Sequence, residues 1–405
     1  MQSVNINRTA LFRASCLSLL VTSLSFGIRA GILNKLGVDF QLDKAQLASI
    51  TATAFYGFPI AVVLGGFIVD IIGMKRLLVI AFLFHLAGIL LTIFAQGFWT
   101  LYISTLLIGL ANGTVEAACN PLVTALYSDN KTTKLNHFHL WFPGGIVIGT
   151  LIVLLLNKFG LGWQIQVGLM LIPTAIYGYL FSKLDFPVTE RVSSGVSTSG
   201  MYKALLNPLF LFMFVCMIGT AITELFTGQW IDVLLKNVTQ NAILILTLDT
   251  GVMVIGRAFA KPVLKLFPPQ VLLLISTILA ATGIYLLSTL TGDAVFFAAI
   301  VFGMGVCYFW PTMLGFVNTN LPETGAIGLN LMGGIGMFAV SIYTIFMGRY
   351  YDNIVQQAGG SNATAGQQVL QTTLIIPLVL IVAFAGLVIY MRSKGKTAPL
   401  KTVAV

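Results

Sequence analysis

The hydrophobic positions of this chain fall into long continuous runs. Stretches such as 81–93, 147–156 and 374–390 are almost wholly apolar and do not alternate with polar residues. A helix needs about 20 apolar residues to cross the hydrocarbon layer of a membrane. Strands of a transmembrane barrel would instead appear as segments of about ten residues with alternating polarity. The pattern therefore predicts an all-α integral membrane protein.

Twelve such runs are separated by short loops, and we expect one transmembrane helix in each. The expected spans are 10–33, 45–72, 77–97, 100–127, 136–157, 162–182, 207–234, 241–266, 270–290, 294–319, 325–350 and 370–391. The longest polar interruption, 183–206, contains the segment SSGVSTSG. It predicts an N-terminal six-helix half (1–182), a cytoplasmic linker (183–206) and a C-terminal six-helix half (207–405).

Composition excludes the other broad classes. Hydrophobic residues make up 57% of the chain and charged residues only 9%, whereas soluble domains have about 25% charged residues. Disorder requires low hydrophobicity and high charge. The net charge of +9 does not indicate a nucleic-acid partner, because the charges lie mostly at the ends of the predicted spans. We expect a monomer whose partners are the lipid bilayer and a small-molecule substrate.

Lys and Arg concentrate on alternate loops, and cytoplasmic loops carry the excess of these residues. The distribution predicts that both termini are cytoplasmic. We expect a multi-pass protein of a plasma membrane of the bacterial inner-membrane type, with no cleavable signal peptide. The cysteines have no metal-site or disulfide spacing (Cys16, Cys119, Cys216 and Cys307). We expect no metal and no cofactor.

The two halves repeat each other. Gly113 precedes Pro121 by eight residues in the fourth span, and Gly303 precedes Pro311 by eight residues in the tenth. The pair Leu-Asn opens both the fifth and the eleventh span. These matches indicate a duplicated six-helix unit. Parallel repeats of this kind are typical of transporters that bind substrate between the repeats.

A short motif follows the second span. Its spacing is Gly66, three residues, Asp70, two residues, Gly73, one residue, then Lys75 and Arg76. It resembles the signature loop of the major facilitator superfamily. The resemblance implies the superfamily's fold of twelve transmembrane helices and alternating access by rocking of the two halves. It also implies a gating role for this loop. The alternative is that the motif is an ordinary positively charged cytoplasmic turn.

Span four reads Gly113-Thr-Val-Glu116-Ala-Ala-Cys-Asn120-Pro121 and span five contains Leu-Asn-His-Phe-His139. A carboxylate at the middle of a membrane helix costs about 2.5–3.5 kcal/mol or more unless it faces a cavity or a partner. The pattern closely resembles that of fucose-permease-like sugar:proton symporters, in which this glutamate serves substrate recognition and proton coupling. For Asn120 the alternatives are a substrate contact or a helix break before Pro121.

The chain departs from those permeases in the first span. They carry an essential aspartate there, whereas this sequence has Arg29 beside Ala30 and no acid. Arginine stays protonated in proteins, so it cannot carry the coupling proton. Three roles remain open for Arg29: an ion pair with Glu116, a bidentate contact to an anionic substrate group, or snorkelling to the interface.

Other polar and aromatic residues lie within spans. We expect carboxylate and amide side chains with a stacked aromatic ring to bind a sugar, and the candidates are Glu224, Gln229, Trp230, Trp141, Trp310 and Tyr308. Such aromatic residues also serve commonly as packing or interface anchors. Asp249 and Arg257 lie two turns apart in the eighth span, and one interpretation is that they pair with each other.

The sequence as a whole predicts a secondary active transporter that imports a sugar or sugar derivative by proton symport, with Glu116 and Glu224 as coupling acids. A symporter for a sugar acid, with Arg29 as anion clamp, and a sodium-coupled sugar transporter are the alternatives. A membrane enzyme is disfavoured because the loops are short and carry no paired-carboxylate motif. A transporter-like sensor is disfavoured because the tail after Arg392 is short.

Overall fold

The computed structural model describes residues 6–42, 44–228, 242–358 and 364–395, and within these ranges it contains helices and no strand. Among the described residues, eleven helical segments are long and apolar enough to cross a membrane. Of the remaining predicted span, 241–266, the described part is also helical and is divided at Phe259 into Ala242–Ala258 and Ala260–Leu266. The prediction of an all-α, multi-pass membrane protein is confirmed.

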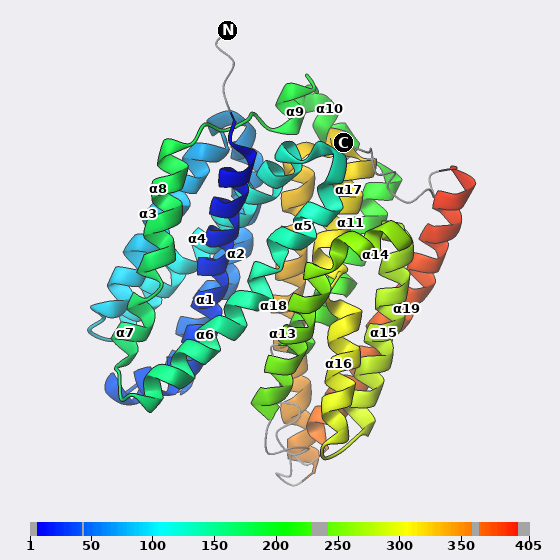
Figure 1. The fold of residues 1–405 in the computed structure, drawn as a ribbon. Coiled ribbons are helices and arrows are strands. Elements are labelled where there is room, and N and C mark those ends of the chain that lie inside the picture. The colour runs from blue at the N-terminus through cyan, green and yellow to red at the C-terminus, as the bar shows by residue number, and fades with distance from the viewer. Residues whose placement is uncertain (1–5, 43, 229–241, 359–363, 396–405) are drawn as a thin grey trace. The chain divides into compact units, whose positions relative to one another are not determined.

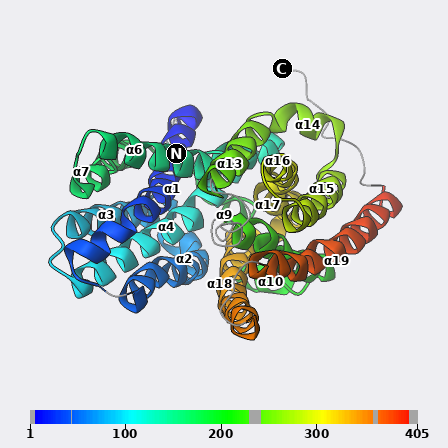
Figure 2. The same cartoon turned by 90° about the horizontal axis from the view of Figure 1, so that it is seen from below.

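Two compact units make up the chain. Unit 1 comprises Met1–Asn207 together with Asn318–Gly334. Within it α1 packs against α6, and α2 and α3 both pack against α4 (Figures 1 and 2). Its helices are α1 (Arg8–Asp39), α2 (Lys44–Ile72), α3 (Met74–Ile93), α4 (Phe98–Leu126), η1 (Ser128–Asn130), α5 (Lys131–His139), α6 (Trp141–Lys158), α7 (Trp163–Gly168), α8 (Leu171–Lys183), α9 (Glu190–Ser193), α10 (Thr198–Ala204) and η3 (Pro322–Thr324).

Unit 2 comprises Pro208–Val317 and Ile335–Val405. Within it α15 packs against α16 and α19, and α13 packs against α16. Its helices are α11 (Pro208–Ala221), a π-helical turn η2 (Ile222–Phe226), α13 (Ala242–Ala258), α14 (Ala260–Leu266), α15 (Pro269–Thr289), α16 (Ala294–Val306) and α19 (Ala365–Ser393). Two more helices contribute residues to both units, α17 (Phe309–Asn320) and α18 (Gly325–Gln357).

Prolines shape the spans that carry polar groups. A proline lacks the N–H that would bond the carbonyl four residues earlier, and buried partners must then satisfy that carbonyl. Pro121 lies inside the continuous helix α4, where the Ala117 carbonyl accepts a bond from the Asn330 amide at 3.0 Å. Pro311 lies in α17, just after the break that separates it from α16. The carbonyl four residues before Pro311, that of Cys307, accepts a bond from Arg257 Nε. Each of the two repeated prolines thus leaves a carbonyl that is bonded by a side chain from another helix.

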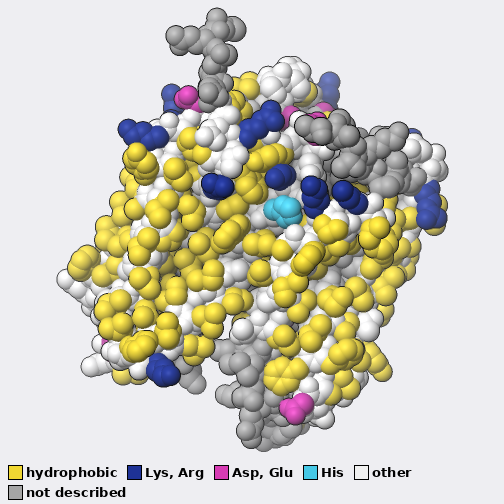
Figure 3. Space-filling view, in the orientation of Figure 1, with side chains coloured by type: hydrophobic (Ala, Val, Ile, Leu, Met, Phe, Trp, Pro, Cys, Tyr) yellow, Lys and Arg dark blue, Asp and Glu magenta, His cyan; other side chains and the backbone are white. Residues whose placement is uncertain are grey.

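Hydrophobic side chains face outward over the membrane-spanning parts of both units. Figure 3 shows them over the middle of each unit's visible face, with charged side chains toward the helix ends. Leu64, Leu154 and Val382 are each more than half exposed. In a water-soluble protein such surfaces would be interaction sites, but here lipid chains cover them.

The repeated glycines occupy equivalent contacts. Gly113 of α4 lies directly against the Phe58 carbonyl of α2, and a Cβ on it would also lie 2.9 Å from Ala61 Cβ. Gly303 of α16 lies against Asp249 of α13, where a Cβ would be 3.0 Å from the backbone carbonyl oxygen. In each unit the span with the glycine thus approaches its partner through backbone contact, which supports the duplication.

We expect Gly113→Ala to destabilise the protein, because the added methyl group would collide with backbone that cannot move away. Overpacking of this kind costs about 1–3 kcal/mol, more than the gain of about 1 kcal/mol from replacing glycine by alanine in a helix. The loss of stability is measured as the fall in melting temperature on thermal unfolding in detergent. Gly386→Ala in α19 is the matched control, because nothing lies within 4 Å of its Cβ position. Equal melting temperatures for the two variants would contradict the close approach.

Candidate functional site

A carboxylate, an amide and an imidazole meet inside unit 1. The Asn120 amide donates to Glu116 Oε2 at 2.5 Å, and His139 Nε2 lies 3.0 Å from Asn120 Oδ1. His139 Nδ1 is also 3.7 Å from Glu116 Oε1. All three side chains are at most 4% exposed. The structure therefore brings together three of the residues that the sequence singled out.

The local geometry follows from the sequence. Glu116 and Asn120 are four residues apart on α4, so their side chains lie one above the other on the same helix face. His139 is the last residue of α5, and Pro143, which has no N–H, cannot bond the His139 carbonyl. The alternative of a helix break before Pro121 is wrong, because α4 continues to Leu126.

This cluster can hold and transfer a proton. A carboxylate and an imidazole in contact can exist as an ion pair or as two neutral groups, and the imidazole titrates in the physiological range. The intervening amide has a donor on the carboxylate side and an acceptor on the imidazole side. A buried carboxyl group is costly in its charged form, so its protonation state is sensitive to what enters the site.

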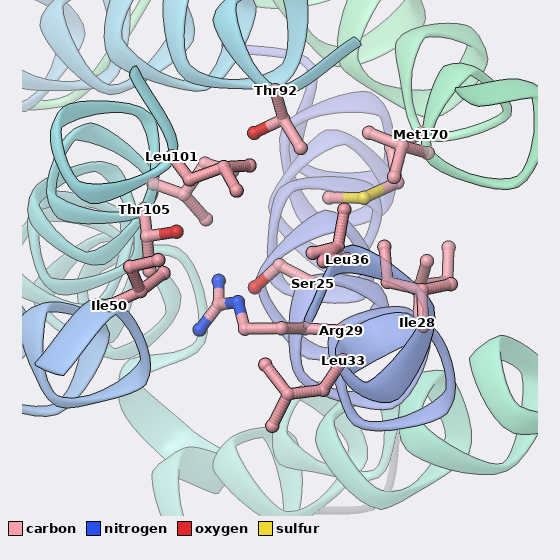
Figure 4. Close-up of a pocket in the computed structure, with 13 residues that line it drawn as sticks. Ser25, Ile28, Arg29, Leu33, Leu36, Ile50, Thr92, Leu101, Thr105 and Met170 are labelled. Atoms are coloured by element: carbon pink, nitrogen blue, oxygen red, sulfur yellow. The ribbon is translucent and has the colours of Figure 1, made fainter. Parts of the chain in front are cut away.

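Arg29 lines a separate pocket in unit 1 (Figure 4). Its side chain extends from α1 past the Ser25 hydroxyl, and the rest of the pocket is largely apolar, with Ile28, Ile32, Leu33, Leu36, Ile50, Thr92, Leu101, Thr105, Ile108, Val167 and Met170. Its guanidinium lies 5.9 Å from the centre of the Phe26 ring. Among the described residues Arg29 forms no ion pair, so the predicted pairing with Glu116 is not found.

A chain of buried hydrogen bonds begins at the pocket wall. Ser25 accepts a bond from the Asn112 amide at 3.1 Å, and His85 Nε2 lies 2.8 Å from Asn112 Oδ1. His85 Nδ1 lies 2.8 Å from the Tyr177 hydroxyl. Sequence reasoning missed the part played by Asn112, although it lies one helical turn before Glu116 on α4. This chain fixes the α4 face that carries Glu116.

In unit 2 an ion pair joins two spans. Arg257 Nη2 of α13 lies 2.7 Å from Glu224 Oε1, and both side chains are at least 94% buried. Arg257 Nε also donates to the Cys307 carbonyl at 2.6 Å, which Pro311 leaves without a helical donor. Glu224 lies in the π-helical turn η2, a distortion that often marks functional sites.

Asp249 does not pair with Arg257, contrary to the interpretation that the two residues of α13 neutralise each other. Arg257 bonds Glu224 instead, and Asp249 has no ion pair with any residue that the structure describes. Its side chain is 2% exposed. Among the described residues of unit 2, two buried acids, Glu224 and Asp249, therefore accompany the buried base Arg257.

The aromatic candidates differ in their surroundings. Trp310 of α17 is 7% exposed, and its indole N–H has no acceptor among the described residues. Trp141 at the start of α6 is half-buried, and its carbonyl accepts a bond from Ser23 at 2.9 Å. Trp310 can therefore donate to an incoming group. The other two candidates of this region, Gln229 and Trp230, lie outside the described residues.

The signature loop binds to the segment between spans six and seven. Asp70 accepts bonds from Thr189 and from Arg191 Nε, the latter at 2.5 Å. Lys75 donates to the Leu184 carbonyl at 2.9 Å. Gly73 has φ +87°, a conformation that favours glycine. The sequence pointed to these loop residues but missed Thr189 and Arg191 as their partners.

Two other residues of the motif differ in their contacts. A Cβ on Gly66 would lie 2.6 Å from Asn330 Cβ, in the part of α18 that belongs to unit 1. Arg76 is exposed. In the described part of the chain, His, Cys, Asp and Glu do not form a group of three that would hold a metal ion.

A comparison with known proteins places these features in context. Residues 15–344 match the family model described as Major Facilitator Superfamily. The chain is 28% identical over 179 residues to the facilitated glucose transporter member 10 of solute carrier family 2 from Xenopus laevis, a match that covers 42% of this chain and 32% of that protein. The chain thus spans about a third of that relative's length.

Two solved structures share the fold over nearly the whole chain. A variant of the E. coli fucose:proton symporter superposes with a TM-score of 0.72 at 15% identity and covers 92% of this chain and 98% of its own. The human organic anion transporter MFSD10 superposes with a TM-score of 0.70 at 11% identity, and the match covers 93% of this chain and 99% of that chain. At such identities the likeness establishes the fold. Together with the family match over most of the sequence, it shows that this chain belongs to the Major Facilitator Superfamily of membrane transporters.

Proposed function

We propose that this protein is a secondary active transporter that imports a sugar or sugar derivative together with a proton. The observation that carries the proposal is the buried cluster of Glu116, Asn120 and His139. It combines hydrogen-bonding groups for hydroxyls with an acid that can bind and release a proton. The similarity to a facilitated glucose transporter and to a fucose:proton symporter supports a sugar as the substrate class.

Substrate binding would involve polar groups for hydroxyls and aromatic rings for the C–H faces of a sugar. Asn120 and His139 lie next to Glu116, and the buried Trp310 indole N–H has no acceptor among the described residues. We propose the same set that the sequence indicated as binding residues, Arg29, Glu116, Asn120, His139, Trp141, Glu224, Gln229, Trp230 and Trp310.

Coupling would depend on the charge of Glu116. When its carboxyl group is protonated, the attraction to His139 and the acceptor strength toward Asn120 both change. A ligand can shift a conformational equilibrium only through a difference in its affinity for the two states. We propose that sugar and proton together favour the reorientation that neither favours alone. Glu116 is the coupling acid of unit 1, and Glu224 is the candidate that the sequence indicates in unit 2.

The loop around Asp70 would control that reorientation. Its ion pair with Arg191 and its bond to Thr189 tie the end of α2 to the linker 183–206. We propose a gating role for Gly66, Asp70, Gly73, Lys75 and Arg76, a monomer divided at this linker into halves 1–182 and 207–405, and a plasma-membrane orientation with both termini in the cytoplasm.

A second candidate function is the symport of a sugar acid. It is favoured by one observation, that the Arg29 guanidinium lines a pocket without an ion-pair partner among the described residues. Arginine binds carboxylates in a bidentate manner, and the structural neighbour MFSD10 is an organic anion transporter. Sodium in place of the proton is a further alternative.

Arg29→Ala distinguishes the two substrates. If Arg29 clamps an anion, counterflow of uronates in proteoliposomes falls at least tenfold, since a charge-assisted bond is worth about 1.5–3 kcal/mol, while counterflow of neutral hexoses persists. If the wild type prefers hexoses and the variant keeps them, Arg29 is structural. Lys35→Ala, an exposed cation on the same helix, is the matched control. A wild type that exchanges no sugar or sugar acid in the panel would contradict the proposed substrate class.

A further inference from the structure

A second cluster, in unit 2, holds more negative than positive charge. Glu224, Asp249 and Arg257 are at most 6% exposed and supply two carboxyl groups for one guanidinium. Arg257 is engaged by Glu224 at 2.7 Å and by the Cys307 carbonyl at 2.6 Å. Asp249 lies two turns away on α13 and forms no ion pair with a residue described in the structure.

The Asp249 carboxyl group occupies space that two glycines leave open. A Cβ on Gly303 would lie 2.7 Å from Oδ1, and one on Gly228 would lie 3.8 Å from Oδ2. Oδ1 has no hydrogen-bond partner among the described residues, and the same is true of Glu224 Oε2 and Thr227 Oγ1. An ionised carboxylate with an unsatisfied oxygen is costly inside a membrane protein.

The neighbouring charged and titratable groups do little to stabilise an ionised Asp249 carboxylate. The turn η2 presents Glu224, which has the same sign. The segment joining α16 and α17 presents Cys307 and Tyr308, and the Tyr308 hydroxyl donates to the Gly256 carbonyl at 2.5 Å. Arg257 is the one cation among these neighbours in the part of the chain that the structure describes, and it is paired with Glu224. One proton on Asp249 would make the three-residue cluster electrically neutral.

We propose that Asp249 is a proton-binding site, occupied near neutral pH, and that it is the exchangeable acid of unit 2 in place of Glu224. Glu224 is then a positioning residue that holds Arg257 and stays ionised. The proton comes from water, forms an O–H bond at the Asp249 carboxyl group and leaves by the reverse step. This inference rests on the proposed proton coupling, and it gives each unit one exchangeable acid, Glu116 in unit 1 and Asp249 in unit 2.

Infrared difference spectroscopy of the purified protein tests the assignment without any substrate. The sample is the Glu116→Gln chain in detergent, so that a proton on Glu116 does not contribute. We expect the carbonyl stretch of a protonated carboxylic acid near neutral pH, with the small shift in D₂O that identifies it. The band should be lost on Asp249→Asn and kept on Asp293→Asn, an exposed aspartate before α16.

Three results would overturn the assignment: no such band, a band that survives Asp249→Asn, or a band abolished when choline chloride is replaced by sodium chloride, which would mark a sodium site. If Asp249→Asn does not fold, the smaller Asp249→Ser removes the same carboxyl group. Because the readout needs no transport, a failure of the sugar panel would leave this test intact, and a missing band would leave sugar transport intact.

Discussion

Glu116→Gln abolishes gradient-driven accumulation of substrate in proteoliposomes, while counterflow remains measurable. The glutamine side chain can still accept the bond from Asn120 that Glu116 accepts at 2.5 Å, but it cannot bind or release a proton. A gradient of one pH unit is worth about 1.4 kcal/mol per proton, or up to about tenfold accumulation. The variant should lose that factor entirely, as measured with radiolabelled substrate.

Asp129→Asn is the matched control for this experiment. Asp129 is an exposed acid in η1, shortly after the helix that carries Glu116, so its neutralisation should change neither accumulation nor counterflow. A Glu116→Gln protein that still accumulates substrate against a gradient would show that the coupling acid lies elsewhere. Loss of counterflow as well would point to a role in binding alone.

Arg257→Gln destabilises the protein strongly. It removes one partner of a buried ion pair and leaves Glu224 uncompensated, which costs about 3–5 kcal/mol. It also removes the donor to the Cys307 carbonyl, which no helical N–H can replace because of Pro311. The melting temperature in detergent should fall well below that of the wild type.

The double variant Glu224→Gln, Arg257→Gln gives the sharper comparison. With both charges gone, two amides can bond each other, and much of the lost stability should return. Arg349→Gln, an exposed arginine of α18, should change the melting temperature little. A double variant less stable than Arg257→Gln alone would contradict the pair seen between η2 and α13.

The helical architecture could be predicted because the membrane imposes it on apolar runs of fixed length. The sequence did not reveal where those helices break. Span five divides at Leu140, and span ten divides before Phe309. In both places a proline follows within a few residues, but Pro121 leaves α4 continuous. Proline position alone therefore does not decide between a break and an unbroken helix, because tertiary partners satisfy the freed carbonyl.

Parts of the site were equally predictable. Glu116 and Asn120 are four residues apart, so helical spacing places them in contact, and a motif placed His139 nearby. The sequence contained no comparable pattern for pairs whose two residues come from distant segments. Arg257 bonds Glu224 rather than Asp249, and Arg191 bonds Asp70 across more than a hundred residues of chain. Charge can be located from a sequence, but the choice among several partners depends on packing.

The central claim, that substrate moves with a proton, is tested most directly by recording pH inside proteoliposomes that carry a trapped fluorescent indicator and no initial gradient. Addition of transported sugar outside wild-type protein should acidify the lumen, and Glu116→Gln should give no acidification while it still exchanges labelled sugar. Sugar entry through the wild type without acidification, or acidification that persists in Glu116→Gln, would contradict the account.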